Sequence, residues 1–334
     1  QVIVFGATAI GGLSSTVSSV HAQQTTVIKF SHVVANDTPK GKSALRFKQL
    51  VEERTAGRVK VEIYPNSTLL NDKNEMAALQ AGTVQMLAPS LSKFGALGIK
   101  EFEAFDLPFA FPEKAILTRV TEGPIGQSLL RVLEPSGIAG LAFWDNGFKV
   151  MTGDRRLEAT ADFKGMKMRI QPSKVLEAQM RALQVEPKAM PFSEVFKALQ
   201  DGVVDGTENT PSNVLSQRMH EVQKFLTISN HGYLGYAVIA NGRFWGGLSP
   251  DLRQTITAAL KDATRYNNAI AAQENDAALD AIRASGKTAI VKLSAGQRQA
   301  WRRALLPVHA QMASWVGADM VEALRLEAAA LGYK

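Results

Sequence analysis

The chain has 334 residues, which is enough for two α/β lobes with separate cores. Its 46% hydrophobic and 21% charged residues are the balance of an ordinary soluble protein. The net charge of +7 suits an anionic partner, but no Lys/Arg block with interleaved aromatics indicates nucleic-acid binding. Cysteine is absent and the five histidines lack zinc-ligand spacing, so we expect no disulfide, cysteine nucleophile or metal site.

The first 22 residues predict a secretory signal peptide. Residues 1–13 are apolar and uncharged, and Val20 and Ala22 are the small residues of an A-x-A-like cleavage site. The usual basic segment is missing, so we expect the sequence to begin inside the signal. An anchor helix or a structural strand is the alternative, but the run is short for a bilayer and Gly11-Gly12 weakens a helix. We therefore expect an exported protein in the periplasm.

From residue 25 the chain alternates between strand and helix patterns. The expected elements are a strand over residues 27–34, a helix from Thr38 to Gly57, a strand over 59–64, a helix over 72–81 and a strand over 84–88. Within the first helix, Ala44, Phe47 and Val51 recur at helical spacing and should face a core. The alternation predicts a largely parallel sheet covered by helices.

A second α/β unit follows. We expect strands at residues 138–144, 148–152, 166–170 and 203–204, and helices capped by Ser173 and Ser193. Residues 76–86 and 196–206 share the pattern A-L-Q-x-G-x-V. Each copy predicts a helix that ends at Gly and enters a strand. Such junctions are common, but two at domain-scale spacing favour two related lobes over one extended sheet.

The C-terminal third is mostly helical. Ser249 begins a helix whose apolar residues keep helical spacing as far as Ile282. At 1.5 Å per residue this helix is about 50 Å long, enough to lie across two lobes. A strand over residues 288–293 and two further helices complete the chain.

Motifs for catalysis or nucleotide binding are absent from the sequence. It contains no HExxH, G-x-S-x-G, phosphate loop or G-x-G-x-x-G. We therefore expect no enzyme activity and no cofactor.

Seven segments carry a combined pattern that is more specific than any one of them. They are FSHVVANDTPKG at 30–41, YPNSTLLND at 64–72, WDNGFKVMT at 144–152, DFKGMKMRIQPSKVLEAQMRAL at 162–183, MPFSEVFKALQDGVVDGTEN at 190–209, HEVQKFL at 220–226 and HGYLGYAVIANGRFW at 231–245. Together they resemble the periplasmic solute-binding proteins of tripartite ATP-independent periplasmic (TRAP) transporters, specifically the dicarboxylate-binding type. The resemblance covers nearly the whole mature chain.

The resemblance implies an α/β, two-lobed periplasmic-binding-protein fold. Each lobe is expected to be a mixed sheet flanked by helices, with hinge strands between the lobes and a long helix across both. Lobe I would hold residues 24–146 and 236–274, and lobe II residues 147–235 and 275–334. The ligand would lie in the cleft between them.

The implied function is the capture of a small organic carboxylate, a C4-dicarboxylate such as malate, succinate or fumarate, by hinge closure. The implied partners are the small and large membrane subunits of a sodium-driven importer. A sugar acid such as a uronate, or a 2-hydroxy or keto monocarboxylate, is the alternative ligand. An ABC-type binding protein and an exported enzyme acting on organic acids are the alternative classes.

Arg169 is the main candidate ligand residue. Its planar guanidinium matches a carboxylate, and the resemblance implies such a clamp at this position. A salt bridge with an internal acid is the alternative. The resemblance adds Lys149, where some relatives carry Arg, together with the amide of Asn209 and the ring of Phe192. For these three residues a surface lysine, an Asx turn and core packing are the respective alternatives.

His32 lies where the first strand enters a loop, and we expect it near the far end of the ligand, with a structural histidine as the alternative. Further candidates lie at other loop or strand ends: Ser173, Ser90, Lys93, Asn146, Tyr236, Asp72 and Lys42. Ser173 is equally a helix cap, and the acid Asp72 suits a hydroxylated ligand better than a bare dicarboxylate. Gln171, two residues after Arg169 in the chain, is a further possible donor.

Overall fold

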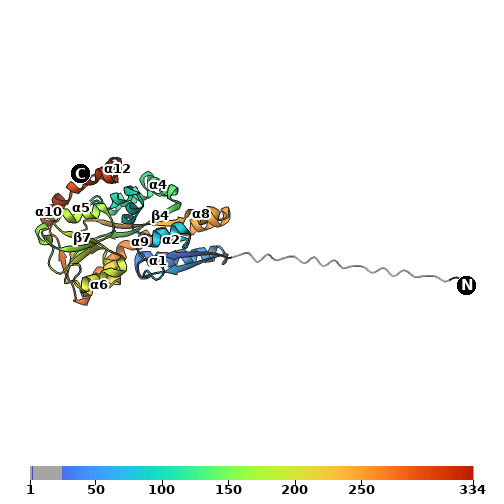
Figure 1. Ribbon diagram of the computed structural model, residues 1–334, viewed down its shortest axis with the longest axis horizontal. Helices are drawn as coiled ribbons and strands as arrows, with labels where there is room; N and C mark the ends of the chain where they lie inside the picture. Colours follow the sequence, from blue (N-terminus) through green and yellow to red (C-terminus); the bar gives the residue numbers. More distant parts are fainter. Residues whose placement is uncertain (1, 3–24, 334) are drawn as a thin grey trace.

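The computed structural model describes residue 2 and residues 25–333. The expected signal peptide lies outside the described residues, apart from Val2. Two β-sheets, each flanked by helices, form two lobes, which confirms the expected mixed α/β fold (Figure 1). No helix in the described part of the chain is long and apolar enough to cross a membrane.

The first lobe is built on a five-stranded sheet. Its strands lie in the order β2 (Val59–Tyr64), β1 (Thr26–Ser31), β3 (Met86–Leu87), β10 (Tyr233–Asn241) and β4 (Ile138–Phe148). β1 runs parallel to β2 and β3, whereas β10 runs antiparallel to β3 and β4. The sheet is mixed because β10 returns from far along the chain and lies between two earlier strands.

The second lobe is built on a six-stranded sheet. Its order is β11 (Ala289–Lys292), β9 (Phe225–Ile228), β5 (Val150–Gly153), β8 (Gly206–Asn209), β6 (Lys167–Ile170) and β7 (Glu186–Ala189). β6 runs parallel to β7 and β8, and β5 runs antiparallel to β8 and β9. The strand expected at residues 203–204 is wrong, because the amides of Val203 and Val204 still bond back to the carbonyl of Ala198.

The chain crosses between the sheets at two neighbouring places. β4 continues into β5 through Lys149, and β9 continues into β10 through residues 229–232. The amide of Lys149 donates to the carbonyl of Gly232 over 2.9 Å, so the two crossings are joined. Two short, paired connections of this kind are suited to act as a hinge.

A long helix forms a third link between the lobes. α9 (Pro250–Ser285) has 36 residues and is capped by Ser249, whose side chain accepts from the amide of Leu252. It packs on α1 (Pro39–Arg54) and β4 in the first lobe and on α7 (Pro211–Ser216) in the second. The expected helix across both lobes is therefore confirmed.

Shorter helices cover the sheets. Beside the first sheet or the segments packed on it are α2 (Glu75–Ala81), α3 (Lys114–Glu122), α4 (Pro124–Arg131), α8 (Gly242–Gly247) and the 3₁₀ segments η1 (Leu91–Leu97), η2 (Lys100–Asp106) and η3 (Glu134–Ser136). With the second sheet are α5 (Lys174–Ala182), α6 (Val195–Gln200), α10 (Ala295–Leu305), η4 (Thr160–Phe163), η5 (Phe192–Glu194) and η6 (Met219–Glu221).

The last two helices touch both lobes. α11 (Pro307–Val316) packs on η2 and on α5, and α12 (Ala318–Ala329) packs on α3. The expected lobe boundaries, which give residues 275–334 entirely to the second lobe, stay a prediction.

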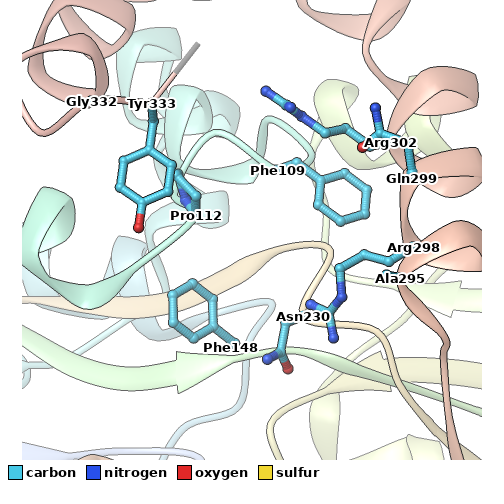
Figure 2. Close-up of a pocket in the computed structure, with 10 residues that line it drawn as sticks. All are labelled: Phe109, Pro112, Phe148, Asn230, Ala295, Arg298, Gln299, Arg302, Gly332 and Tyr333. Atoms are coloured by element: carbon cyan, nitrogen blue, oxygen red, sulfur yellow. The ribbon is translucent and has the colours of Figure 1, made fainter.

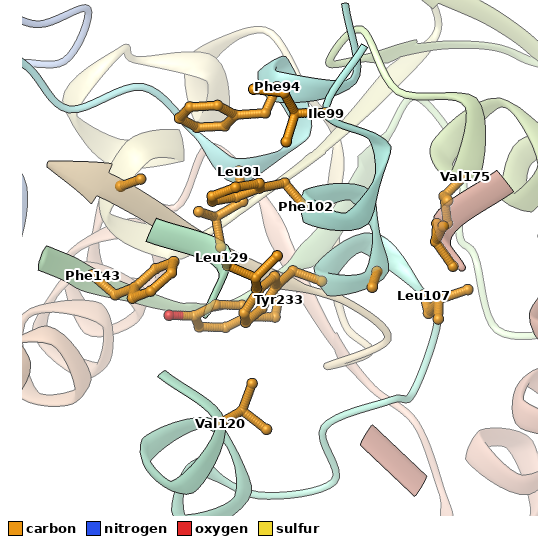
Figure 3. Packing of buried hydrophobic residues seen from close by; sticks show 14 of the residues in the cluster. Leu91, Phe94, Ile99, Phe102, Leu107, Val120, Leu129, Phe143, Val175 and Tyr233 are labelled. Atoms are coloured by element: carbon orange, nitrogen blue, oxygen red, sulfur yellow. The ribbon is translucent and has the colours of Figure 1, made fainter. Parts of the chain in front are cut away.

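An aromatic cluster forms the core beside η1 and η2 (Figure 3). Phe94 stacks on Phe102 with ring centroids 4.3 Å apart, and Phe143 and Tyr233 bring in the hinge-side strands β4 and β10. Val175 of α5 belongs to the same cluster, so this core also reaches the second lobe. The packing fixes η1 and η2 rigidly beside the gap between the lobes.

The repeated A-L-Q-x-G-x-V pattern occupies equivalent places in the two lobes. α2 is followed by Gly82 at φ 80° and leads into β3, while α6 is followed by Gly202 at φ 69° and leads into β8. Glycine adopts this left-handed backbone without a steric penalty. The cap expected at Ser173 is confirmed, whereas that at Ser193 is wrong because Ser193 lies inside η5 and α6 begins after Glu194.

Candidate functional site

A small cavity of about 20 Å³ lies between the lobes. The segments that leave the parallel strands β1, β3, β6 and β8 contribute Val33, Ser90, Gln171 and Asn209 to its wall. In α/β proteins, ligands bind in crevices at the carboxyl ends of such strands. Seven of the expected ligand residues line the cavity: Asp72, Ser90, Lys93, Gln171, Phe192, Asn209 and Tyr236.

Arg169 lies beside this cavity, on strand β6, which lies between β8 and the edge strand β7. Its side chain is buried, and its Nε and Nη2 donate to the carbonyl of Met190 over 3.2 and 3.0 Å. The guanidinium is 5.9 Å from the ring centroid of Phe192, which forms part of the cavity wall. Among the described residues, no carboxylate oxygen lies within 4.0 Å of it. Burial lowers its pKa, although an arginine stays charged.

Lys40 is a ligand candidate that the sequence analysis missed. It lies in the first turn of α1, its side chain is buried, and it lines the cavity. Its Nζ donates to the carbonyl of Ala88 over 3.0 Å and lies 3.7 Å from the ring centroid of Tyr236. Burial, together with repulsion from Lys93, lowers the pKa of Lys40 to about 7.

Lys93 lines the cavity, but two neighbouring carboxylates balance its positive charge. Its buried Nζ forms ion pairs with both Asp72 and Glu75. Burial disfavours the charged lysine, but the two carboxylates outweigh it and raise its pKa. Burial alone would raise the pKa of Asp72, but the charge of Lys93 outweighs this effect and lowers that pKa to about 2.

Three hydrogen bonds fasten the lobes together at the cavity. The amide of Phe192 donates to Asp72 Oδ2 over 2.6 Å, and Gln171 Nε2 donates to Ser90 Oγ over 2.6 Å. Asn213 Nδ2 donates over 3.4 Å to the hydroxyl of Tyr236. These contacts describe a closed cleft, because each joins a residue from one lobe to a residue from the other.

Asn209 presents an amide to the cavity at the end of β8. Its Oδ1 accepts from the amide of Thr210 and from Asn213 Nδ2, each over 2.9 Å. The first contact is a local turn of the kind expected before Pro211. The side-chain oxygen is therefore occupied, and the amino group of this cavity-lining residue is the part of the amide that can still donate to a ligand.

Lys149 lies at the hinge and is not part of the cavity wall. Its buried Nζ donates to Glu208 Oε1 over 2.6 Å and lies 3.6 Å from Asp106 Oδ1. Burial disfavours the charged lysine, but Glu208 and Asp106 outweigh it and raise its pKa. Burial also opposes ionisation of Glu208, yet Lys149 and His231 hold its pKa well below the usual range. The ligand contact expected for Lys149 stays a prediction.

Four other expected residues lie near the cleft or on the surface. His32 is buried after β1, and burial together with the nearby charge of Lys40 lowers its pKa to about 3, so it is neutral. Asn146 donates to Thr210 Oγ1 over 2.6 Å. Ser173 caps α5 and donates to Glu103 over 3.0 Å, and Lys42 pairs with Glu274 at the surface over 2.6 Å. None of the four lines the cavity.

A larger groove of about 720 Å³ lies beside the two crossings. Figure 2 shows the rings of Phe109, Phe148 and Tyr333 around it and the side chains of Arg298 and Arg302 extending from α10. None of the expected ligand residues lines it. The smaller interlobe cavity is therefore the better candidate, because Lys40 lines it and Arg169 lies beside it, both buried and neither with a carboxylate oxygen of residues 25–333 within 4.0 Å.

The chain matches a known protein family over most of its length. Residues 30–314 match the model described as "Bacterial extracellular solute-binding protein, family 7". The C4-dicarboxylate-binding periplasmic protein DctP of Rhodobacter capsulatus is 55% identical over 320 residues, which cover 96% of this chain and 95% of the relative. The protein of the same name from Shewanella loihica is 44% identical, with 89% and 88% covered.

Solved structures show the same fold. A TRAP periplasmic solute-binding protein from Shewanella oneidensis, with bound succinate, has a TM-score of 0.89 and 43% identity, with 91% of this chain and 99% of that chain covered. One from Pseudomonas aeruginosa, with bound L-malate, has a TM-score of 0.84 and 45% identity, with 86% and 99% covered. A sugar acid binding protein from Advenella mimigardefordensis, in complex with galactonate, has a TM-score of 0.88 and 30% identity, with 91% and 98% covered. The chain belongs to family 7 of the bacterial extracellular solute-binding proteins.

Proposed function

We propose that this protein is the periplasmic solute-binding component of a TRAP transporter and captures a C4-dicarboxylate such as succinate or malate. It would deliver this ligand, unchanged, to the small and large membrane subunits of the transporter. The names of the relatives and the ligands of the solved structures support this proposal.

The observation that carries the proposal is the environment of Arg169. Its guanidinium is buried beside the interlobe cavity and is bonded to the carbonyl of Met190, with no carboxylate within 4.0 Å among the described residues. An unpaired charge away from water is unfavourable, so such a group favours an incoming anion. A charge-assisted hydrogen bond contributes roughly 1.5–3 kcal/mol net, and two or three of them suffice for micromolar affinity.

A dicarboxylate fits this site better than a sugar acid. The relatives and structures associated with dicarboxylates are 38–55% identical to this chain, against 30% for the galactonate-binding protein. A sugar acid carries many hydroxyl groups that need acceptors. The carboxylate of Asp72, which would suit them, already accepts from the amide of Phe192 and pairs with Lys93.

Capture would follow from hinge closure. Opening at the two crossings would break the Gln171–Ser90 and Phe192–Asp72 hydrogen bonds and expose Arg169 to the periplasm. An anion then pairs with Arg169, and the first lobe closes over its other end. The closed form is the state that we expect the membrane subunits to recognise.

The test is ligand binding by the Arg169→Ala variant. Wild-type protein should bind succinate in calorimetry and melt at a higher temperature with it, because the ligand stabilises the native state. Arg169→Ala should weaken binding about 30-fold or more, since truncating one partner of a buried charge pair costs roughly 2–5 kcal/mol. Arg169→Lys should restore little, because an ammonium lacks the planar fork.

The matched control is Arg181→Ala, which removes an exposed arginine from the same lobe and should leave binding unchanged. Near-native succinate affinity in Arg169→Ala would overturn the site. A wild-type protein that responds to sugars or amino acids but to no organic acid would overturn the ligand class. Turnover of an organic acid by the purified protein would favour an exported enzyme.

A further inference from the structure

We propose that Lys40 binds the second carboxylate of the ligand and thereby makes the site select dicarboxylates over monocarboxylates of equal length. This inference rests on the proposed function and deepens it. It assigns the specificity-determining role to a residue of the first lobe, opposite the Arg169 clamp in the second.

The contacts of Lys40 leave one of its donors available. An ammonium group has three N–H donors. One points to the carbonyl of Ala88 over 3.0 Å, and the group lies 3.7 Å above the centre of the Tyr236 ring. No carboxylate oxygen lies within 4.0 Å of it in residues 25–333. A ligand carboxylate in the cavity, which Lys40 lines, would take the remaining donor.

Two buried cations at the cleft can each take one carboxylate of a ligand. Two of the buried cations there are already neutralised, Lys93 by Asp72 and Glu75 and Lys149 by Glu208 and Asp106. Arg169 and Lys40 have no such partner among the described residues, and they come from opposite lobes. A ligand with one carboxylate can pair with only one of them, whereas a dicarboxylate can pair with both and hold the lobes together.

Five titratable groups face Lys40. They are His32, Asp72, Glu75, Lys93 and Tyr236. His32 has a pKa of about 3 and Asp72 of about 2, burial raises the pKa of Tyr236, and the carboxylates Glu75 and Asp72 raise that of Lys93. Lys40, with a pKa of about 7, is the member of this group that loses its charge between pH 7 and 9.

The test compares succinate with butyrate, which replaces one carboxylate by a methyl group on the same four-carbon chain. Calorimetry at pH 6.5 should show that wild type strongly prefers succinate. Lys40→Met should weaken succinate binding roughly 10- to 150-fold, the range expected for one charge-assisted hydrogen bond, and leave butyrate binding equal or tighter. Lys197→Met, at an exposed lysine paired with Asp201, is the control and should change neither.

The outcomes separate the two proposals. If wild type binds no dicarboxylate, the proposed function fails. If wild type binds succinate and Lys40→Met binds it equally well, the inference alone is overturned. Lys40→Gln gives a second readout should the methionine variant not fold, which circular dichroism would show.

The wild-type protein supplies an independent readout. Succinate stays fully ionised above pH 7, so its affinity should fall up to about tenfold per pH unit between pH 7 and 9 as Lys40 loses its proton. Butyrate affinity should stay level over the same range. A flat succinate profile would overturn the role of Lys40.

Discussion

The Nζ atom of Lys149 donates to Glu208 Oε1 over 2.6 Å, and this buried ion pair joins one hinge crossing to strand β8 of the second sheet. Asp106 approaches the same Nζ to 3.6 Å from η2 of the first lobe. His231, at the other crossing, places Nε2 2.9 Å from Glu208 Oε2. These four side chains therefore link both crossings and both lobes.

Removing the central cation of this network should destabilise the protein strongly. Lys149→Met leaves Glu208 and Asp106 as buried carboxylates without a cation, and breaking a buried pair in this way costs about 3–5 kcal/mol. Urea unfolding followed by circular dichroism should show a loss of that size. The double variant Lys149→Met/Glu208→Gln should recover part of it. Lys197→Met, at an exposed lysine, is the control and should leave the urea midpoint unchanged. An unchanged midpoint for Lys149→Met would show that the buried ion pair contributes nothing to stability.

Asp106 should make the stability fall as pH rises through weakly acidic values. Burial raises its pKa from 3.8 to about 6 in the folded protein, against the opposing effect of Lys149. The folded state thus holds the proton more tightly than the unfolded state, and this stabilisation is complete below about pH 4 and lost as pH approaches 6. A shift of about two units corresponds to roughly 2–3 kcal/mol.

Asp106→Asn removes this titration while keeping the shape of the side chain. The free energy of unfolding of wild type minus that of the variant should therefore fall by roughly 2–3 kcal/mol between pH 4 and 7. The pKa of Glu208 is lowered from 4.5 in the folded protein, so its contribution to the free energy of unfolding is lost as pH falls. Both proteins contain Glu208, so this contribution cancels in the difference between them. Parallel pH profiles for the two proteins would contradict the assignment.

The elements that depend on local sequence were predictable, and several site residues were not. Helix caps at Thr38, Ser173 and Ser249 and the left-handed glycines after α2 and α6 follow from short-range chemistry. The insertion of β10 between β3 and β4 is a long-range pairing that no local pattern encodes. The partner of Lys149 is unpredictable for the same reason, since Glu208 lies 59 residues away.

The position of Lys40 in the cleft, in contrast, could have been predicted from the helical spacing in the sequence. It stands four residues before Ala44 and seven before Phe47, so it shares the buried face of α1 with them. Lys42, the expected residue, is two positions further on, and residues two apart point to different sides of a helix. Extending the apolar spacing of the helix backwards by one turn would have selected the correct lysine for the cleft.

Gly41 sets the geometry that places Lys40 in the cleft. A Cβ atom at Gly41 would lie 2.2 Å from the carbonyl oxygen of Ala35 and 2.5 Å from Cα of Asn36. Both are backbone atoms, so either α1 or the loop that follows β1 would have to move. That loop and the first turn of α1 carry Val33, Val34 and Lys40, which form part of the wall of the cavity in the first lobe.

Gly41→Ala should therefore impair stability and binding together. Overpacking of a closely packed site costs typically 1–3 kcal/mol, and succinate affinity should fall about tenfold or more as Lys40 moves away from the ligand. Gly246→Ala is the matched control, since nothing lies within 4 Å of a Cβ atom there and the exposed site is helical. It should leave binding unchanged and stability equal or slightly higher, because alanine favours a helix over glycine. If Gly41→Ala melted and bound succinate like wild type, the close approach of α1 to this loop would not control the position of Lys40.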